Sequence, residues 1–151
     1  MQIVRFGLGG QLLAFPVESV REVVTSTHFS AVFHAPPFVR GLINVRGEAV
    51  PVFDPGVLFD LPDSGSGEEE VVVLIEDGGL TAGILAQRPV DIRDLADDEL
   101  SEATKAAPNI EAIRHVAQLD EGLVLILDAH RLFQHDSVRA LRDDGDLLQI
   151  R

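Results

Sequence analysis

The sequence predicts a mainly β fold in which short strands close into small barrels. Segments rich in Val, Ile and Phe alternate with Gly-rich turns along most of the 151 residues. Turns that recur every 8–12 residues or so are typical of small barrels, whereas a parallel sheet needs longer helical crossovers. With 46% hydrophobic residues, the chain can bury one good core or two small cores that share an interface.

The first strands follow one another closely. Residues 2–8 alternate in polarity, turn through Gly7–Gly10, and return as a second strand over residues 11–15. The Pro16 segment suits a single helical turn, and the β-branched residues 20–25 then predict a further strand.

The central segment, residues 35–54, reads APPFVRGLINVRGEAVPVFD and predicts a hairpin with its turn centred on Gly47. Pro51 cannot donate a backbone hydrogen bond, so its strand should lie at an edge, at a bulge, or pair on one side only. By strict alternation, Asn44, Arg46 and Glu48 share one face of this hairpin and present a polar surface. The same Arg46 side chain also suits an ion pair with Glu22, which would hold the strand of residues 20–24 against the hairpin.

The second half follows a similar layout. Strands are expected over residues 71–76, 80–86 and 90–93, then a solvated acidic loop or helical turn over 94–102, and a hairpin over 112–127. Asp54 and Asp128 are expected to cap short helices, the second with Leu132 and Phe133 on its apolar side. Residues 137–141 predict a final turn, and residues 147–150 either add a strand or pack back. The acidic, Gly-rich residues 61–70 predict a linker between approximate subdomains 1–62 and 69–136, followed by a tail over 137–151.

The central segment VRGLINVRGEAVPVFD resembles the signature of the CheW family of chemotaxis coupling proteins. Residues 9–24 resemble that family's opening hairpin and its Val-x-Glu segment, and residues 123–133 resemble its closing strand and helix. The resemblance implies one CheW-like domain over residues 1–151. It also implies two SH3-like five-stranded β-barrels packed side by side over a shared apolar layer, with short helices including one near the C-terminus.

The resemblance further implies a non-enzymatic adaptor. Such an adaptor links the cytoplasmic tip of a methyl-accepting chemoreceptor to the regulatory domain of a CheA-type histidine kinase. Carried over residue by residue, the implied partner-binding positions lie in the strand after the first hairpin and around the central turn: Val20, Glu22, Val23, Gly41, Asn44, Val45, Arg46 and Gly47.

Some positions depart from the family's pattern. Ala86 and Gln87 stand where a Val-Asp pair is common, and His115 stands where a Gly is usual. Phe53 and Asp54 also replace an Asp-Leu continuation. The first two departures keep open an alternative from another class, a divergent CheW-like module outside receptor arrays that binds a small molecule or a metal.

Composition excludes several functions. A formal net charge of −13 argues against nucleic acid or an anionic membrane surface as a partner. The chain has no cysteine, no apolar run of the roughly 20 residues that span a bilayer, and no secretory pattern at its start, so we expect a cytoplasmic protein that does not insert into membranes. His130 and His135 are five residues apart, which places them on different sides of a helix, and no serine lies in a nucleophile elbow. We therefore expect no catalytic residue, no metal ligand and no cofactor.

Overall fold

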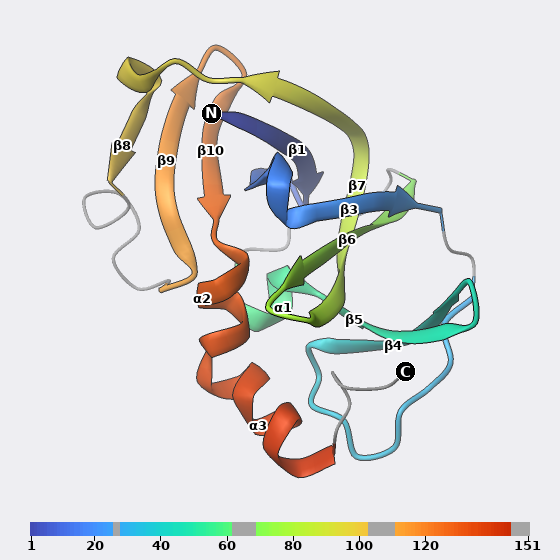
Figure 1. The fold of residues 1–151 in the computed structure, drawn as a ribbon. Coiled ribbons are helices and arrows are strands. Elements are labelled where there is room, and N and C mark those ends of the chain that lie inside the picture. The colour runs from blue at the N-terminus through green and yellow to red at the C-terminus, as the bar shows by residue number, and fades with distance from the viewer. Residues whose placement is uncertain (26–27, 62–68, 103–110, 146–151) are drawn as a thin grey trace.

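The chain folds into two small β-barrels that lie side by side and share one long strand (Figure 1). This arrangement comes from a computed structural model, which describes residues 1–25, 28–61, 69–102 and 111–145. Among these residues, no helix is both long enough and apolar enough to cross a membrane.

The first barrel is built from five strands of the middle of the chain. Its strands are β3 (Val20–Val24), β4 (Val39–Val45), β5 (Glu48–Phe53), β6 (Glu70–Asp77) and the first part of β7 (Leu80–Asp94). In this barrel β3 pairs with β6, β6 with β7, β7 with β5, and β5 with β4; only the β5–β7 pair is parallel.

The second barrel combines strands from both ends of the chain. Its own strands are β1 (Gln2–Leu8), β2 (Gln11–Pro16), β8 (Leu100–Glu102), β9 (Ile113–Leu119) and β10 (Gly122–Leu127). The last part of β7 pairs with β1, β1 with β2, β2 with β10, β10 with β9, and β9 with β8; here only β2–β10 is parallel.

Short helices connect these strands. Asp54 caps α1 (Pro55–Leu58) by accepting a hydrogen bond from the Gly56 N–H at 2.9 Å. Asp128 caps α2 (Ala129–Gln134) by accepting one from the Arg131 N–H at 3.0 Å. Both caps were predicted from sequence. The helical elements are η1 (Val17–Ser19), α1 (Pro55–Leu58), η2 (Asp97–Glu99), α2 (Ala129–Gln134) and α3 (Asp136–Gly145).

Three apolar clusters hold the barrels together. The strand β6 is buried on both faces: Val72 and Leu74 point into the core of the first barrel, whereas Val73 and Ile75 join a larger cluster between the barrels. Strand β10 does the same for the second barrel, with Ile126 pointing inward. The larger cluster also takes in α2 and α3 side chains, so it forms the shared apolar layer that the sequence implied.

The structure differs from the sequence prediction in several places. The segments 80–86 and 90–93 form one strand, β7, which exchanges β6 for β1 as its neighbour. As a result, the strand pairing does not divide the chain near residues 62–69, because β1 and β2 belong with β8–β10. Part of the acidic segment pairs as β8, and the final turn is the longer helix α3. The expectation for residues 147–150 lies outside the described residues.

Pro51 lies where its missing N–H does no harm. It stands opposite Leu42 in the β4–β5 pair, and the backbone N–H and C=O of Leu42 bond instead to Ser30, both at 2.9 Å. The strand β5 as a whole pairs with β4 on one side and with β7 on the other, so the prediction that it pairs on one side only is wrong. Pro51 is tolerated because the ladder to β7 covers Val52 and Phe53 and does not include Pro51.

Candidate partner-binding site

The tip of the β4–β5 hairpin is a two-residue turn made by Arg46 and Gly47. Both have positive φ, 51° and 85°, and Val45 pairs directly with Glu48 across the turn. These values are those of a type I′ turn, whose twist matches that of the flanking strands. The Asn44 Oδ1 accepts a hydrogen bond from the Gly47 N–H at 2.8 Å and closes the turn from inside.

The prediction that Asn44, Arg46 and Glu48 share one polar face of the hairpin is wrong. Asn44 pairs with Ala49 and Glu48 pairs with Val45, so Asn44 and Glu48 point to opposite faces of the hairpin. Arg46 belongs to neither strand. Alternation by two does not carry through a turn that reverses the chain, which is why the pattern misled the prediction.

The predicted ion pair between Arg46 and Glu22 is present. The Arg46 Nη1 donates to the Glu22 Oε1 at 3.2 Å, and its Nη2 donates to the other carboxylate oxygen, so the contact is bidentate. The Arg46 side chain is 66% exposed and that of Glu22 is 29% exposed. The hydrogen bonds from Arg46 lower the pKa of the Glu22 carboxyl, and the same bonds raise the pKa of Arg46.

The other β3 residues lie in different surroundings. Val20 is half-buried and packs against the layer between the barrels, whereas Val23 is 39% exposed. The β3–β6 pair has a register shift between Val20 and Glu22, so the two strands do not pair residue for residue there. Of the predicted β3 positions, Glu22 and Val23 can therefore contact a partner directly.

Gly41 is required by a close approach of two backbone segments. Its φ is +151°, and a Cβ placed there would lie 2.7 Å from the Ser30 carbonyl oxygen. That approach brings Ser30 beside β4, where it pairs with Leu42. Gly41 therefore shapes the site by allowing this close contact. That Gly41 itself binds a partner stays a prediction.

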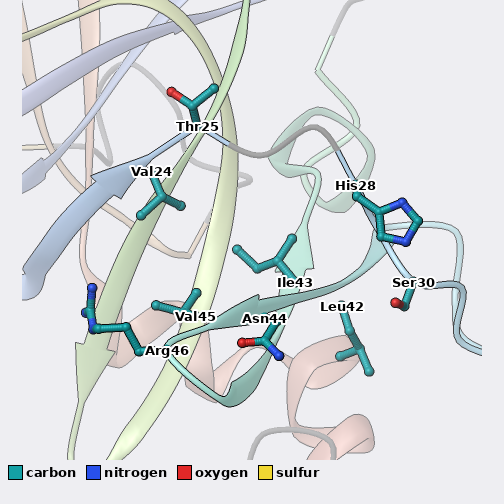
Figure 2. A pocket seen from close by; sticks show the side chains of 9 residues that line it. All are labelled: Val24, Thr25, His28, Ser30, Leu42, Ile43, Asn44, Val45 and Arg46. Atoms are coloured by element: carbon teal, nitrogen blue, oxygen red, sulfur yellow. The ribbon is translucent and has the colours of Figure 1, made fainter.

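An open hollow of about 470 Å³ lies between the end of β3 and the outer edge of β4 (Figure 2). Its lining combines apolar side chains with hydroxyl, amide, imidazole and guanidinium groups: Val24, Thr25, His28, Ser30, Leu42, Ile43, Asn44, Val45 and Arg46. Sequence reasoning identified Asn44, Val45 and Arg46 but missed Thr25, His28 and Ser30. These three come to β4 through the Ser30–Leu42 bridge, for which the sequence carries no local signal.

The departures at residues 86, 87 and 115 are buried or half-buried in β7 and β9. Ala86 is fully buried in the shared layer, and the Gln87 Oε1 accepts a hydrogen bond from the Gly9 N–H at 2.9 Å. His115 is half-buried in β9, where burial lowers the pKa of its imidazole and the charges of Arg114 and Arg131 act in the same direction.

The histidines of the C-terminal helices serve separate local contacts. The His130 Nδ1 lies 2.9 Å from an Asp77 carboxylate oxygen, and His135 packs edge-on against Phe59 with 6.0 Å between ring centroids. Within the described part of the chain, no group of three or more acidic or histidine side chains is arranged to hold a metal ion. The alternative of a metal-binding module thus gains no support from these residues.

The fold and the site together define a class of protein: a two-barrel β module that presents an ion-paired hairpin. The chain belongs to the CheW-like domain family, whose model matches residues 2–137. It is 26% identical to the chemotaxis protein CheW of Treponema pallidum over 93% of this chain and 86% of that protein. It is 23% identical to the CheW protein of Klebsiella aerogenes over 88% of this chain and 81% of that one.

A solved structure has the same fold. The crystal structure of the scaffolding protein TtCheW from Thermoanaerobacter tengcongensis superposes with a TM-score of 0.78 and 24% sequence identity. The match covers 90% of this chain and 89% of that one. The predicted architecture of two SH3-like β-barrels side by side is therefore confirmed.

Proposed function

We propose that this chain is a coupling adaptor of bacterial chemosensory signalling. In this role it binds the cytoplasmic tip of a methyl-accepting chemoreceptor and the regulatory domain of a CheA-type histidine kinase, and it acts in the cytoplasm without catalysing a reaction. Family membership over residues 2–137 and relatives named as chemotaxis proteins support the proposal.

The observation that carries the proposal is the Arg46–Glu22 pair. An exposed ion pair of this kind adds little to stability, because water screens it and two long side chains lose freedom. The Arg46 guanidinium nevertheless stands at the tip of a hairpin, two-thirds exposed, with its fork of donors fixed by a carboxylate. Such a group can set the register of a partner while exposed apolar neighbours such as Val23 supply affinity.

Titration calorimetry with the purified kinase regulatory domain, and separately with a receptor tip fragment, tests this role. We expect Arg46→Ala to weaken binding to at least one partner by about tenfold or more. Arg46→Lys keeps the charge but loses the planar fork, so it should also weaken binding. Arg114→Ala provides the matched control. Arg114 is likewise exposed and ion-paired, at 2.9 Å from Asp128, but it lies on β9 of the second barrel.

The outcomes separate the function from the placement of the site. If the unmodified chain binds neither partner, the adaptor function is refuted. If it binds both, and folded Arg46→Ala binds each as tightly as Arg114→Ala does, the function stands and the hairpin face is the wrong surface. Thermal melting of each variant shows whether a loss of binding comes from unfolding.

A further inference from the structure

The loop between β3 and β4 presents an aromatic side chain to solvent. Phe33 is 89% exposed, whereas Phe38, five residues later, is buried against Phe53 with 5.3 Å between ring centroids. His34 beside it has a φ of +61°, and Pro36 and Pro37 follow. Because the loop is bonded to β4 through Ser30 on one side and restricted by prolines on the other, Phe33 is held out on a short, stiffened turn.

A hollow that suits an aromatic ring lies close by in the same chain. The lining of the 470 Å³ hollow includes apolar side chains: Ile43 belongs to the core cluster of the first barrel, and Val24 packs against that cluster. Its volume lies within the range of about 300–1,000 Å³ that is usual for ligand pockets, and it is open to solvent, so a side chain of another molecule can reach it. Ser30 lines the hollow and Phe33 is three residues further on, which limits their separation to roughly 11 Å.

The charge of the chain makes this region distinct. The sequence holds 25 acidic residues and a net charge of −13, yet residues 23–47 contain no Asp or Glu. Phe33 and all nine residues that line the hollow fall within that stretch. Glu22 and Glu70, which lie beside this region in the fold, are ion-paired with its Arg46 and Arg40, so two copies that meet here face less net negative charge than the chain carries as a whole.

We propose that two copies of this chain associate through this region, with Phe33 of each copy seated in the hollow of the other. The protruding Phe33 side chain, which we call the knob, and the hollow lie near each other in one protomer, as a two-fold symmetric contact requires. The pairing has a consequence for regulation, because Asn44, Val45 and Arg46 also line the hollow. Self-association therefore covers the proposed partner-binding face, and the two kinds of complex exclude each other. The association itself does not rest on the proposed function.

Sedimentation velocity over a range from low to high micromolar concentration tests the pairing without any other protein. We expect a monomer–dimer equilibrium that Phe33→Ala weakens by at least about tenfold. Thr25→Trp, which places an indole at the wall of the hollow, should weaken it similarly. Ile92→Ala is the matched control, because Ile92 is 65% exposed but lies on the part of β7 that pairs with β1.

A mixing experiment identifies the reciprocal geometry. Phe33→Ala keeps an open hollow and Thr25→Trp keeps the knob, so an equimolar mixture regains one of the two contacts. The mixture should therefore dimerise more strongly than either variant alone. Raising the salt concentration should strengthen the dimer of the unmodified chain, because the Debye length falls from about 10 Å at 0.1 M to about 3 Å at 1 M and the repulsion of two acidic chains is screened.

Several results would overturn the proposal. A chain that stays monomeric at every concentration refutes it, as does a Phe33→Ala dimer as strong as that of Ile92→Ala. A mixture that associates no better than its two components, each shown to be folded by thermal melting, refutes the reciprocal seating. Loss of the dimer with rising salt contradicts the argument from charge.

Discussion

Replacing Gly41 by alanine tests whether the close approach of the β3–β4 loop to β4 holds the site together. The new Cβ would lie 2.7 Å from the Ser30 carbonyl oxygen and 3.0 Å from the Phe29 Cβ. The first of these neighbours is backbone, so a rotamer change cannot relieve the contact. The loop must move away from β4, and the two Ser30–Leu42 hydrogen bonds, both 2.9 Å long, must stretch or break.

The expected magnitude follows from two contributions. A φ of +151° is strained for any residue with a Cβ and costs roughly 1–3 kcal/mol. Weakening two hydrogen bonds adds about 0.5–1.5 kcal/mol for each bond that is lost. If both bonds are lost, we therefore expect the free energy of unfolding to fall by about 2–6 kcal/mol. For a chain of this length, that loss lowers the melting temperature by roughly 4–24 °C.

Urea unfolding of Gly41→Ala beside Gly47→Ala separates the two causes. Gly47 also has a positive φ, +85°, but a Cβ there meets no atom within 4 Å. Replacing Gly47 by alanine should lower the free energy of unfolding by only about 1 kcal/mol, because a residue with a Cβ disfavours this positive φ. Equal losses for the two variants would refute the argument, since the contact with Ser30 would then contribute nothing.

Two further predictions concern other parts of the molecule. Burial lowers the pKa of His115 in the folded chain below the value of about 6.5 that it has in the unfolded chain. As the pH falls below that value, the unfolded chain therefore binds more protons than the folded chain does. The free energy of unfolding should therefore decrease below about pH 6.5, and His115→Gln should remove that part of the decrease in urea titrations at neutral and acidic pH. Val138 of α3 is fully buried in the shared layer, so Val138→Ala should cost about 2 kcal/mol in the same assay, whereas Val57→Ala, at a position 50% exposed, should cost much less.

Sequence reasoning succeeded where structure is decided locally. The caps at Asp54 and Asp128 depend on bonds to backbone groups two or three residues away, and both formed as expected. The central hairpin depends on a two-residue turn and its flanking apolar residues, and both can be recognised in the sequence. Even the Arg46–Glu22 pair, whose partners are 24 positions apart, followed once β3 was expected beside the hairpin.

The assignment of strands to barrels could not be predicted in the same way. Gln2 pairs with Asp94, and Leu12 pairs with Val124, so the second barrel is closed by contacts that span most of the chain. The hydrophobic periodicity within a short segment of sequence does not indicate which distant strand that segment will pair with. Residues 80–94 also read as two strands because Pro89 interrupts the pattern, although β7 continues through it and changes its neighbour there.

The position of Arg46 links the error about its face to the argument for its function. Two-residue turns of this type favour Asn, Asp or Gly, because both central residues need positive φ. Arg46 takes that conformation with a full side chain, and its ion pair with Glu22 is too exposed to offset the strain by much. Stability of the folded chain therefore gives little reason for an arginine here. We propose that a contact with a partner gives a better one, because the guanidinium at the hairpin tip is two-thirds exposed while its pair with Glu22 fixes its orientation.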